Sequence, residues 1–198
     1  MFTVALESTA EITIRRSRFL AFLHPSTSKE HIRSYLQSLK HEHWDAVHHC
    51  YAYRLGTDGL EYRMSDDGEP SGTAGKPILF ALQQASLTNV VLVVVRYFGG
   101  VKLGVGPLAR AYADAAKAAI DVASLRELIP LQKILIHCDY DDVSRVIDLL
   151  QEVHADYEQH FADAVSFDVV LPERDVDFLT EQVIERTGAR AGFSKVAP

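Results

Sequence analysis

Two glycine-rich segments hold most of the side chains whose types and spacing could do chemistry. The first, SDDGEPSGTAGKP from Ser65 to Pro77, sets three carboxylates ahead of a lysine. The second, VVRYFGGVKLG from Val94 to Gly104, places an arginine and a lysine around paired glycines. Each segment leads into a helical pattern, and the unpaired N–H groups at a helix start attract anions. Both segments are therefore candidate phosphate sites.

The first segment fails the test for a Walker-type phosphate loop. That motif requires a glycine five positions before the Gly-Lys pair and a Ser or Thr directly after it. Pro70 and Pro77 occupy those two positions. A glycine-rich turn that runs into a helix start remains, with Lys76 beside it. The residues of this motif loop are Ser65, Asp66, Asp67, Gly68, Glu69, Gly72, Thr73 and Gly75.

The three acids of the loop, Asp66, Asp67 and Glu69, have two interpretations. They could hold a divalent cation or a small phosphorylated ligand, in a metal-dependent enzyme or in a binding protein. Their spacing is not that of an EF-hand. Asp-Gly and Glu-Pro pairs are typical of turns, in which Asp side chains accept hydrogen bonds from nearby backbone N–H groups. We favour the turn interpretation and keep the ligand site as the alternative.

A third group of polar residues contains potential metal ligands: His41, His43, His48, His49 and Cys50. Their spacing matches no common zinc site. Adjacent residues of a strand point to opposite faces, which separates His48 from His49. The two cysteines of the chain do not suggest a disulfide framework. We therefore expect no catalytic residue, no bound metal and no cofactor.

The net charge of −7 argues against a protein that coats nucleic acid through bulk positive charge, because non-specific affinity comes mainly from neutralised phosphates. Local basic patches remain near Arg15 and Arg16 and around the second glycine-rich segment. These residues could contact RNA phosphates, or they could be ordinary surface charges that are hydrated by water. The predicted nucleic-acid or phosphate-binding residues are Arg18, Lys76, Arg96, Lys102, Arg110, Gly99, Gly100 and Gly104.

The elements that would position these side chains alternate between strand and helix periodicity. The last strand pattern of the first half shows no polar alternation until Arg96, as in a central strand that is covered on both faces. Helix patterns follow a capping box at Thr27 and Glu30, and follow Pro77 and Pro107, which we expect at the first helical position. The predicted strands of this half cover residues 11–15, 19–23, 48–54 and 89–98.

Near residue 129 the pattern restarts in the order strand, helix, strand, strand, helix, strand, which is the ferredoxin-like βαββαβ order. Gly188 is expected to end its second helix, and the last strand is expected at residues 189–196. We therefore predict an α+β protein of two domains, residues 1–129 and 130–198. The longest aliphatic run, Val90 to Val95, is too short for a membrane span, so we expect a cytoplasmic protein with no membrane partner.

Four short blocks resemble the signatures of the IMPACT/YigZ family and occur in that family's order. Two are Arg15-Arg-Ser-Arg-Phe19 and His48-His-Cys-Tyr-Ala-Tyr53, and the others are the two glycine-rich segments. These blocks span the first domain, and the tail resembles the family's bacterial C-terminal domain of unknown function. Pro107 is a departure, because the family more often has glycine there. Proline removes an N–H donor from the helix start and weakens the case for an anion at this turn.

The resemblance implies a first domain with a β-α fold like domain IV of elongation factor G and the second domain of a small-subunit ribosomal protein. It implies a ferredoxin-like second domain similar to domain V of that factor. In eukaryotes the family modulates the kinase response to amino-acid starvation through an additional N-terminal domain. This chain begins with the family core, so the kinase role is not carried over. The implied function is a non-enzymatic translation-linked regulator or an RNA- or ribosome-binding factor, with RNA, the ribosome or a translation-control protein as partner.

Overall fold

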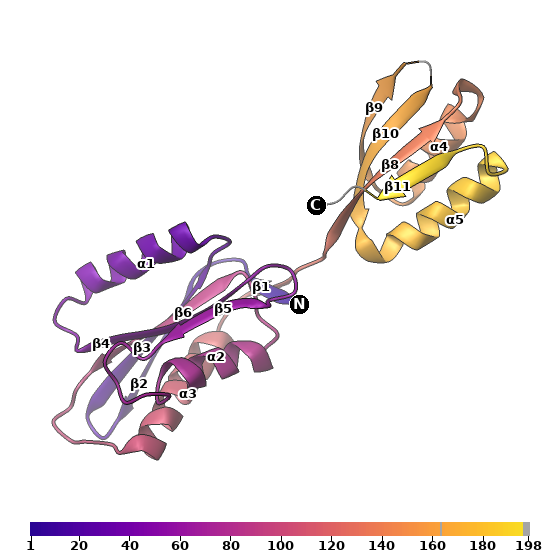
Figure 1. Cartoon of the computed structure of the whole chain (residues 1–198). Coiled ribbons are helices and arrows are strands. Elements are labelled where there is room, and N and C mark those ends of the chain that lie inside the picture. Colours follow the sequence, from indigo (N-terminus) through magenta and orange to yellow (C-terminus); the bar gives the residue numbers. More distant parts are fainter. Residues whose placement is uncertain (163, 196–198) are drawn as a thin grey trace. The chain divides into compact units, whose positions relative to one another are not determined.

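The computed structural model describes residues 1–162 and 164–195, and the chain forms two compact units, Met1–Leu128 and Ile129–Pro198 (Figure 1). The boundary expected from the sequence lies one residue further along. Each unit has its own hydrophobic core, so the prediction of a two-domain α+β protein is confirmed. Among the described residues, no helix combines the length and the apolar content that crossing a membrane requires.

The first unit is built on a five-stranded antiparallel sheet with the order β2-β3-β6-β4-β5. The central strand β6 is buried in all but its last residue, as its unbroken apolar run predicts. Strand β5 was not predicted, because its exposed edge position leaves no apolar alternation. The strands are β2 (Ser8–Ile14), β3 (Ser17–Pro25), β4 (His48–Leu55), β5 (Glu61–Ser65) and β6 (Val90–Tyr97), with a separate pair, β1 (Phe2–Val4) and β7 (Leu125–Glu127).

Three helices cover this sheet: α1 (Lys29–Glu42) on one face, and α2 (Gly75–Gln84) and α3 (Val105–Asp121) on the other (Figure 1). Alternate residues of β6 point to opposite faces, so one strand contributes to two cores. Val91, Val93 and Val95 pack in the cluster that contains the buried residues of α1. The intervening residues of β6 pack in the cluster under α2 and α3.

The predicted helix starts are wrong by one or two residues. Helix α1 is capped by Ser28, whose Oγ accepts the His31 N–H at 3.2 Å, and not by the expected box at Thr27. Helices α2 and α3 begin two residues before Pro77 and Pro107, so each proline is the third helical residue. The N–H at that position also lacks an intrahelical partner, which is why proline is tolerated there.

The second unit has the predicted βαββαβ order, and its antiparallel strands are arranged β11-β8-β10-β9, which is the split-βαβ topology. Gly188 ends the last helix with φ +61°, as predicted. The last strand begins later than expected, and Val196 lies outside the described residues. The elements are β8 (Leu131–Cys138), η1 (Tyr140–Asp142), α4 (Val143–Glu152), β9 (Asp156–Phe161), β10 (Val165–Pro172), η2 (Glu173–Asp175), α5 (Val176–Thr187) and β11 (Gly192–Lys195).

Candidate functional site

Both glycine-rich segments meet at one end of the first sheet. At the end of strand β6, Tyr97 pairs with Arg18 at the start of β3, and Arg96 pairs with His48 at the start of β4. Strand β5 pairs with β4 and ends here as well, with Ser65 opposite Tyr51. Loops that are far apart in the sequence are therefore neighbours. We call the four connecting segments, residues 15–16, 43–47, 66–74 and 98–104, the loop end.

The carboxylate of Asp66 organises the first glycine-rich segment. It accepts backbone N–H groups from Gly72 at 2.8 Å, Ala74 at 3.0 Å and Gly75 at 2.8 Å. Burial raises the pKa of Asp66, but these three donors outweigh it and hold the pKa below its ordinary value. The turn interpretation is thus correct for Asp66. The protein's own carboxylate lies at the start of α2, and the phosphate site expected at this turn stays a prediction.

Glu69 and Arg96 form a buried ion pair under the same segment. Arg96 Nη1 donates to Glu69 Oε1 at 2.6 Å, and Tyr112 Oη donates to the same oxygen at 2.8 Å. The side chains of Arg96 and Glu69 are only 7% and 4% exposed. Burial is the main cause that raises the pKa of Tyr112, so its hydroxyl remains a donor. The charge of Arg96 is therefore committed to Glu69 inside the domain, and its contact with phosphate stays a prediction.

The remaining polar side chains of this cluster also have partners within the protein. Asp67 Oδ2 accepts the His49 N–H at 2.7 Å, and Lys40 Nζ lies 3.2 Å from Asp67 Oδ1. His48 Nδ1 donates to the Asp67 carbonyl oxygen at 2.8 Å. Cys50 is fully buried, and burial raises its pKa to about 12, so it is a neutral thiol and not a nucleophile at neutral pH.

The carboxylates of Asp66, Asp67 and Glu69 do not converge as metal ligands, since each is held by a different set of donors. In the part of the chain that the structure describes, one group has three ligand atoms within 4.8 Å of one another: Glu158, His160 and Asp168. It lies on β9 and β10 of the second unit, where Lys133 Nζ is 3.3 Å from Asp168 Oδ2. The alternative ligand site at the motif loop is thus not assembled.

The outer surface of the loop end carries exposed cations, some with an ion pair and some without. Arg18 is exposed but bound to Glu11 by two hydrogen bonds of 2.7 and 3.1 Å, and its guanidinium lies 5.4 Å from the centroid of the Tyr97 ring. Its charge is therefore partly neutralised. Other exposed cations at or beside this end have no ion pair within residues 1–162 and 164–195: Arg15, Arg16, Lys76, Lys102 and Arg110.

Gly99 joins the second glycine-rich segment to the β2–β3 hairpin. Its N–H donates to Ser17 Oγ at 3.1 Å, and a Cβ at this position would lie 2.1 Å from the carbonyl carbon of Arg16. Gly100 and Gly104 have φ values of +83° and +81°, which glycine adopts without strain. The hairpin tip with Arg15 and Arg16 is consequently packed against the segment that carries Lys102. A direct backbone contact from these glycines to phosphate stays a prediction.

Two exposed aromatic residues at this end could not be recognised as surface residues by periodicity. Trp44, in the segment between α1 and β4, is 81% exposed, and Phe98, directly after β6, is 49% exposed. Large apolar residues are normally expected in the core. Trp44 follows the polar His43, and Phe98 follows the last residue of β6, so neither continues an apolar period. Phe98 lies inside the RYFGG block, so its position at the end of the predicted strand, next to paired glycines, was an available signal.

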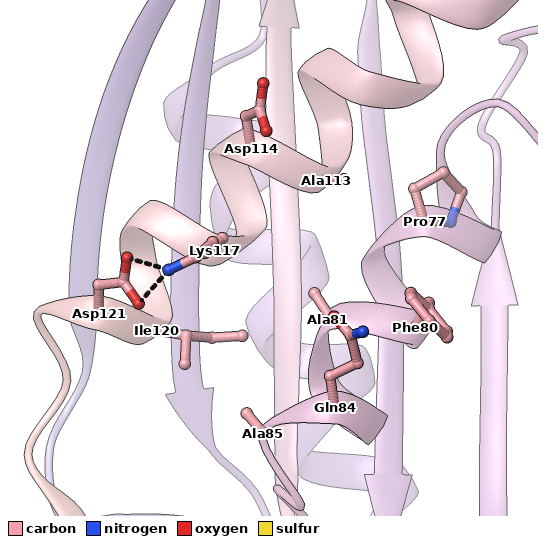
Figure 2. Close-up of a pocket in the computed structure, with 10 residues that line it drawn as sticks. All are labelled: Pro77, Phe80, Ala81, Gln84, Ala85, Ala113, Asp114, Lys117, Ile120 and Asp121. Atoms are coloured by element: carbon pink, nitrogen blue, oxygen red, sulfur yellow. Dashed lines mark hydrogen bonds and ion pairs between the residues drawn. The ribbon is translucent and has the colours of Figure 1, made fainter.

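A shallow groove lies between α2 and α3 on the outer face of the domain (Figure 2). Phe80 and Ala81 of α2 face Ala113 and Ile120 of α3 across a volume of ≈ 290 Å³. A neighbouring hollow of ≈ 530 Å³ extends toward β5 and the helix starts, with Lys76 on its lining. The sequence predicted these two helices but not this half-exposed apolar surface.

Replacing Asp66 with alanine is expected to lower the free energy of unfolding by about 1–2 kcal/mol at neutral pH, because three N–H groups lose their acceptor. The folded-state pKa of Asp66 is depressed, so its stabilisation is fully present above the unfolded pKa and is lost as the pH falls through the folded pKa. Urea titrations at pH 7 and in acid should show that the free energies of unfolding of the unsubstituted protein and of Asp66→Ala become more similar as the pH falls. Asp58→Ala is the control, since Asp58 accepts a single N–H. Equal losses in both variants would contradict this role for Asp66.

Comparison with known proteins agrees with the family expected from the sequence. Residues 15–120 match the model described as the Impact N-terminal domain, which covers more than half of the chain. Residues 136–190 match the model described as a domain of unknown function (DUF1949). A crystal structure of "an hypothetical protein" aligns with a TM-score of 0.69 and 29% identity, covering 99% of this chain and 97% of that chain.

Relatives similar to this chain come from bacteria and eukaryotes. The IMPACT family member YvyE of Bacillus subtilis (strain 168) is 32% identical over 195 residues, which is 98% of this chain and 90% of that protein. The IMPACT family member YigZ of Escherichia coli (strain K12) is 35% identical over 152 residues, 73% of this chain and 74% of that protein. Protein IMPACT of Homo sapiens is 34% identical over 98 residues, 47% of this chain and 30% of that protein. With both domain models matched and relatives aligned along nearly its whole length, the chain belongs to the IMPACT family.

Proposed function

We propose that this protein is a non-enzymatic, translation-linked factor that binds RNA or the ribosome through the loop end. The observation that carries the proposal is the group of exposed cations without an ion pair in the described structure, among them Arg15, Arg16 and Lys102. They lie on segments held together by Gly99, in a chain whose net charge is −7. On a protein of negative net charge, a local basic surface attracts a polyanion such as RNA to that surface and not to the rest of the molecule.

The interior of the loop end supports a binding role over a catalytic one. Its carboxylates, thiol and arginine are bonded to one another or to backbone groups, and Cys50 is held as a thiol. These interactions fix the loops that present the cations. The surface therefore resembles a rigid support for electrostatic contacts more than a set of groups that is available to react.

The expected likeness to elongation factor G is part of the same proposal. If the first unit resembles domain IV and the second resembles domain V of that factor, the likeness would support a translation-linked role. This likeness remains a prediction, and superposition of each unit separately on those domains would test it.

Ribosome co-sedimentation across a salt series tests the proposed function. We expect binding at low salt that weakens as salt rises, with a log–log slope of about −0.7 to −0.9 per phosphate contact. Lys102→Glu should weaken binding roughly tenfold and reduce the slope by about one contact. Arg33→Glu is the matched control, because Arg33 is exposed and lies in the first turns of α1, near the end of β3 and away from the loop end.

Two results would argue against this function. One is the absence of association with ribosomes or ribosomal RNA at low salt. The other is an equal loss of binding in Lys102→Glu and Arg33→Glu, which would indicate an effect of net charge instead of a contact at the loop end.

A further inference from the structure

Phe98 is half-exposed, and the buried cation of Arg96 lies against its ring. The Arg96 guanidinium lies over this ring, 5.6 Å from its centroid, and is also 5.5 Å from the centroid of the Phe19 ring. The guanidinium is fixed by its ion pair with Glu69. Phe98 itself remains 49% exposed. The ring is thus both held in place and accessible.

Unpaired cations lie close to this ring. Gly99, the next residue, packs its backbone against Arg16 and Ser17, so the hairpin tip is a direct neighbour of Phe98. Arg15 and Arg16 form the tip of that hairpin, and both have positive φ values, 45° and 68°. Lys102 follows four residues after Phe98 and is exposed. The ring therefore lies beside two segments that carry exposed positive charges.

A second aromatic side chain projects from the same end of the domain. Trp44 is the only tryptophan of the chain and is 81% exposed. Its segment is tied to β6 through Tyr97, whose hydroxyl donates to Asp45 Oδ1 at 3.3 Å and lies 2.9 Å from His43 Nδ1. The aromatic residues and the cations are thus carried by loops that are fixed to one sheet.

We propose that the loop end binds unpaired nucleotides of RNA, with a base stacked on the exposed face of Phe98 and the adjoining phosphates on Arg15, Arg16 and Lys102. The proposal rests on the proposed function and narrows its ligand. Bases in an A-form duplex are stacked on one another and cannot reach a protein ring, whereas bases of loops, bulges and ends stack on aromatic side chains. A duplex would use the cations alone, and a single strand uses both the cations and the ring.

The test compares a fluorescein-labelled single-stranded RNA of about ten nucleotides with a blunt duplex of the same sequence, by fluorescence anisotropy at low salt. We expect the single strand to bind the full chain more tightly. Phe98→Ala should weaken single-strand binding about tenfold, the loss of one stacked base, and leave duplex binding unchanged. Phe98→Tyr should retain binding, because the ring is kept. Phe178→Ala is the control, since Phe178 of the second unit is 55% exposed.

The outcomes separate this inference from the function on which it rests. If the duplex binds as tightly as the single strand, or if Phe98→Ala weakens both ligands equally, the inference fails while RNA binding stands. If neither RNA binds and Lys102→Glu changes nothing, both fail. Thermal unfolding of each variant identifies any loss of fold, and Phe98→Tyr keeps the test decisive if Phe98→Ala is destabilised.

Discussion

Replacing Arg96 with methionine is expected to lower the free energy of unfolding of the first domain by about 3–5 kcal/mol, the usual cost of removing one partner from a buried ion pair. Glu69, at 4% exposure, would lose its arginine partner and keep the Tyr112 hydroxyl as a hydrogen-bond donor, with His48 Nε2 3.7 Å from its other oxygen. Removing the arginine also withdraws the group that packs between Phe19 and Phe98. Urea unfolding followed by far-ultraviolet circular dichroism measures the effect, because the helices and strands of both domains contribute to that signal.

Two further variants make this prediction specific. Arg186→Met breaks an exposed pair with Glu152 and is expected to change stability little, since surface pairs contribute weakly. The double variant Arg96→Met with Glu69→Leu should recover part of the loss, because no unpaired charge stays buried. A single variant at Arg96 that behaves like Arg186→Met would contradict the buried-pair interpretation.

Replacing Gly99 with alanine is expected to cost about 3 kcal/mol, at the upper end of what overpacking costs. The added Cβ would lie 2.1 Å from the carbonyl carbon and 2.2 Å from the carbonyl oxygen of Arg16, and backbone atoms cannot move aside as a flexible side chain does. The hairpin tip and the segment with Lys102 must therefore separate. We expect a lower urea midpoint together with weaker RNA binding.

Gly106→Ala is the matched control for that change. It lies in the first turn of α3, its φ is not in the left-handed region, and a Cβ there would meet no atom within 4 Å. Alanine should leave stability unchanged or raise it by up to about 1 kcal/mol, because glycine is the poorer helix former. Equal effects of the two substitutions would show that the close approach at Gly99 is not a constraint.

The elements with a strong apolar period could be predicted from the sequence, and the ones at edges could not. Strand β6 was recognised because burial on both faces requires an unbroken apolar run. Strand β5 escaped because its residues are exposed or half-buried, so no period marks it. The helix starts shifted because proline fits several positions of the first turn and therefore does not mark one of them.

The candidate site was predicted at the level of segments more than of side chains. Asp66 could be interpreted from its own loop, because the N–H groups that it accepts lie within nine residues of it. Arg96 could not, because its partner Glu69 is 27 residues away and becomes a neighbour only in the folded sheet. Arg18 was likewise predicted as a phosphate contact, although a strand pairing brings Glu11 against it. The exposure of Phe98 depends on the same tertiary packing.

Because of the Asp66 carboxylate, the two glycine-rich turns should differ in how readily their backbone N–H groups accept an anion. A phosphate approaching α2 would have to displace the Asp66 carboxylate from the backbone N–H groups. Because this carboxylate belongs to the same chain, its effective concentration at those N–H groups exceeds that of a free anion. At α3, where no side chain caps Gly104, an approaching anion meets no such tethered competitor. If RNA binds as proposed, elevated phosphate in a buffer should therefore compete with it only at the second turn.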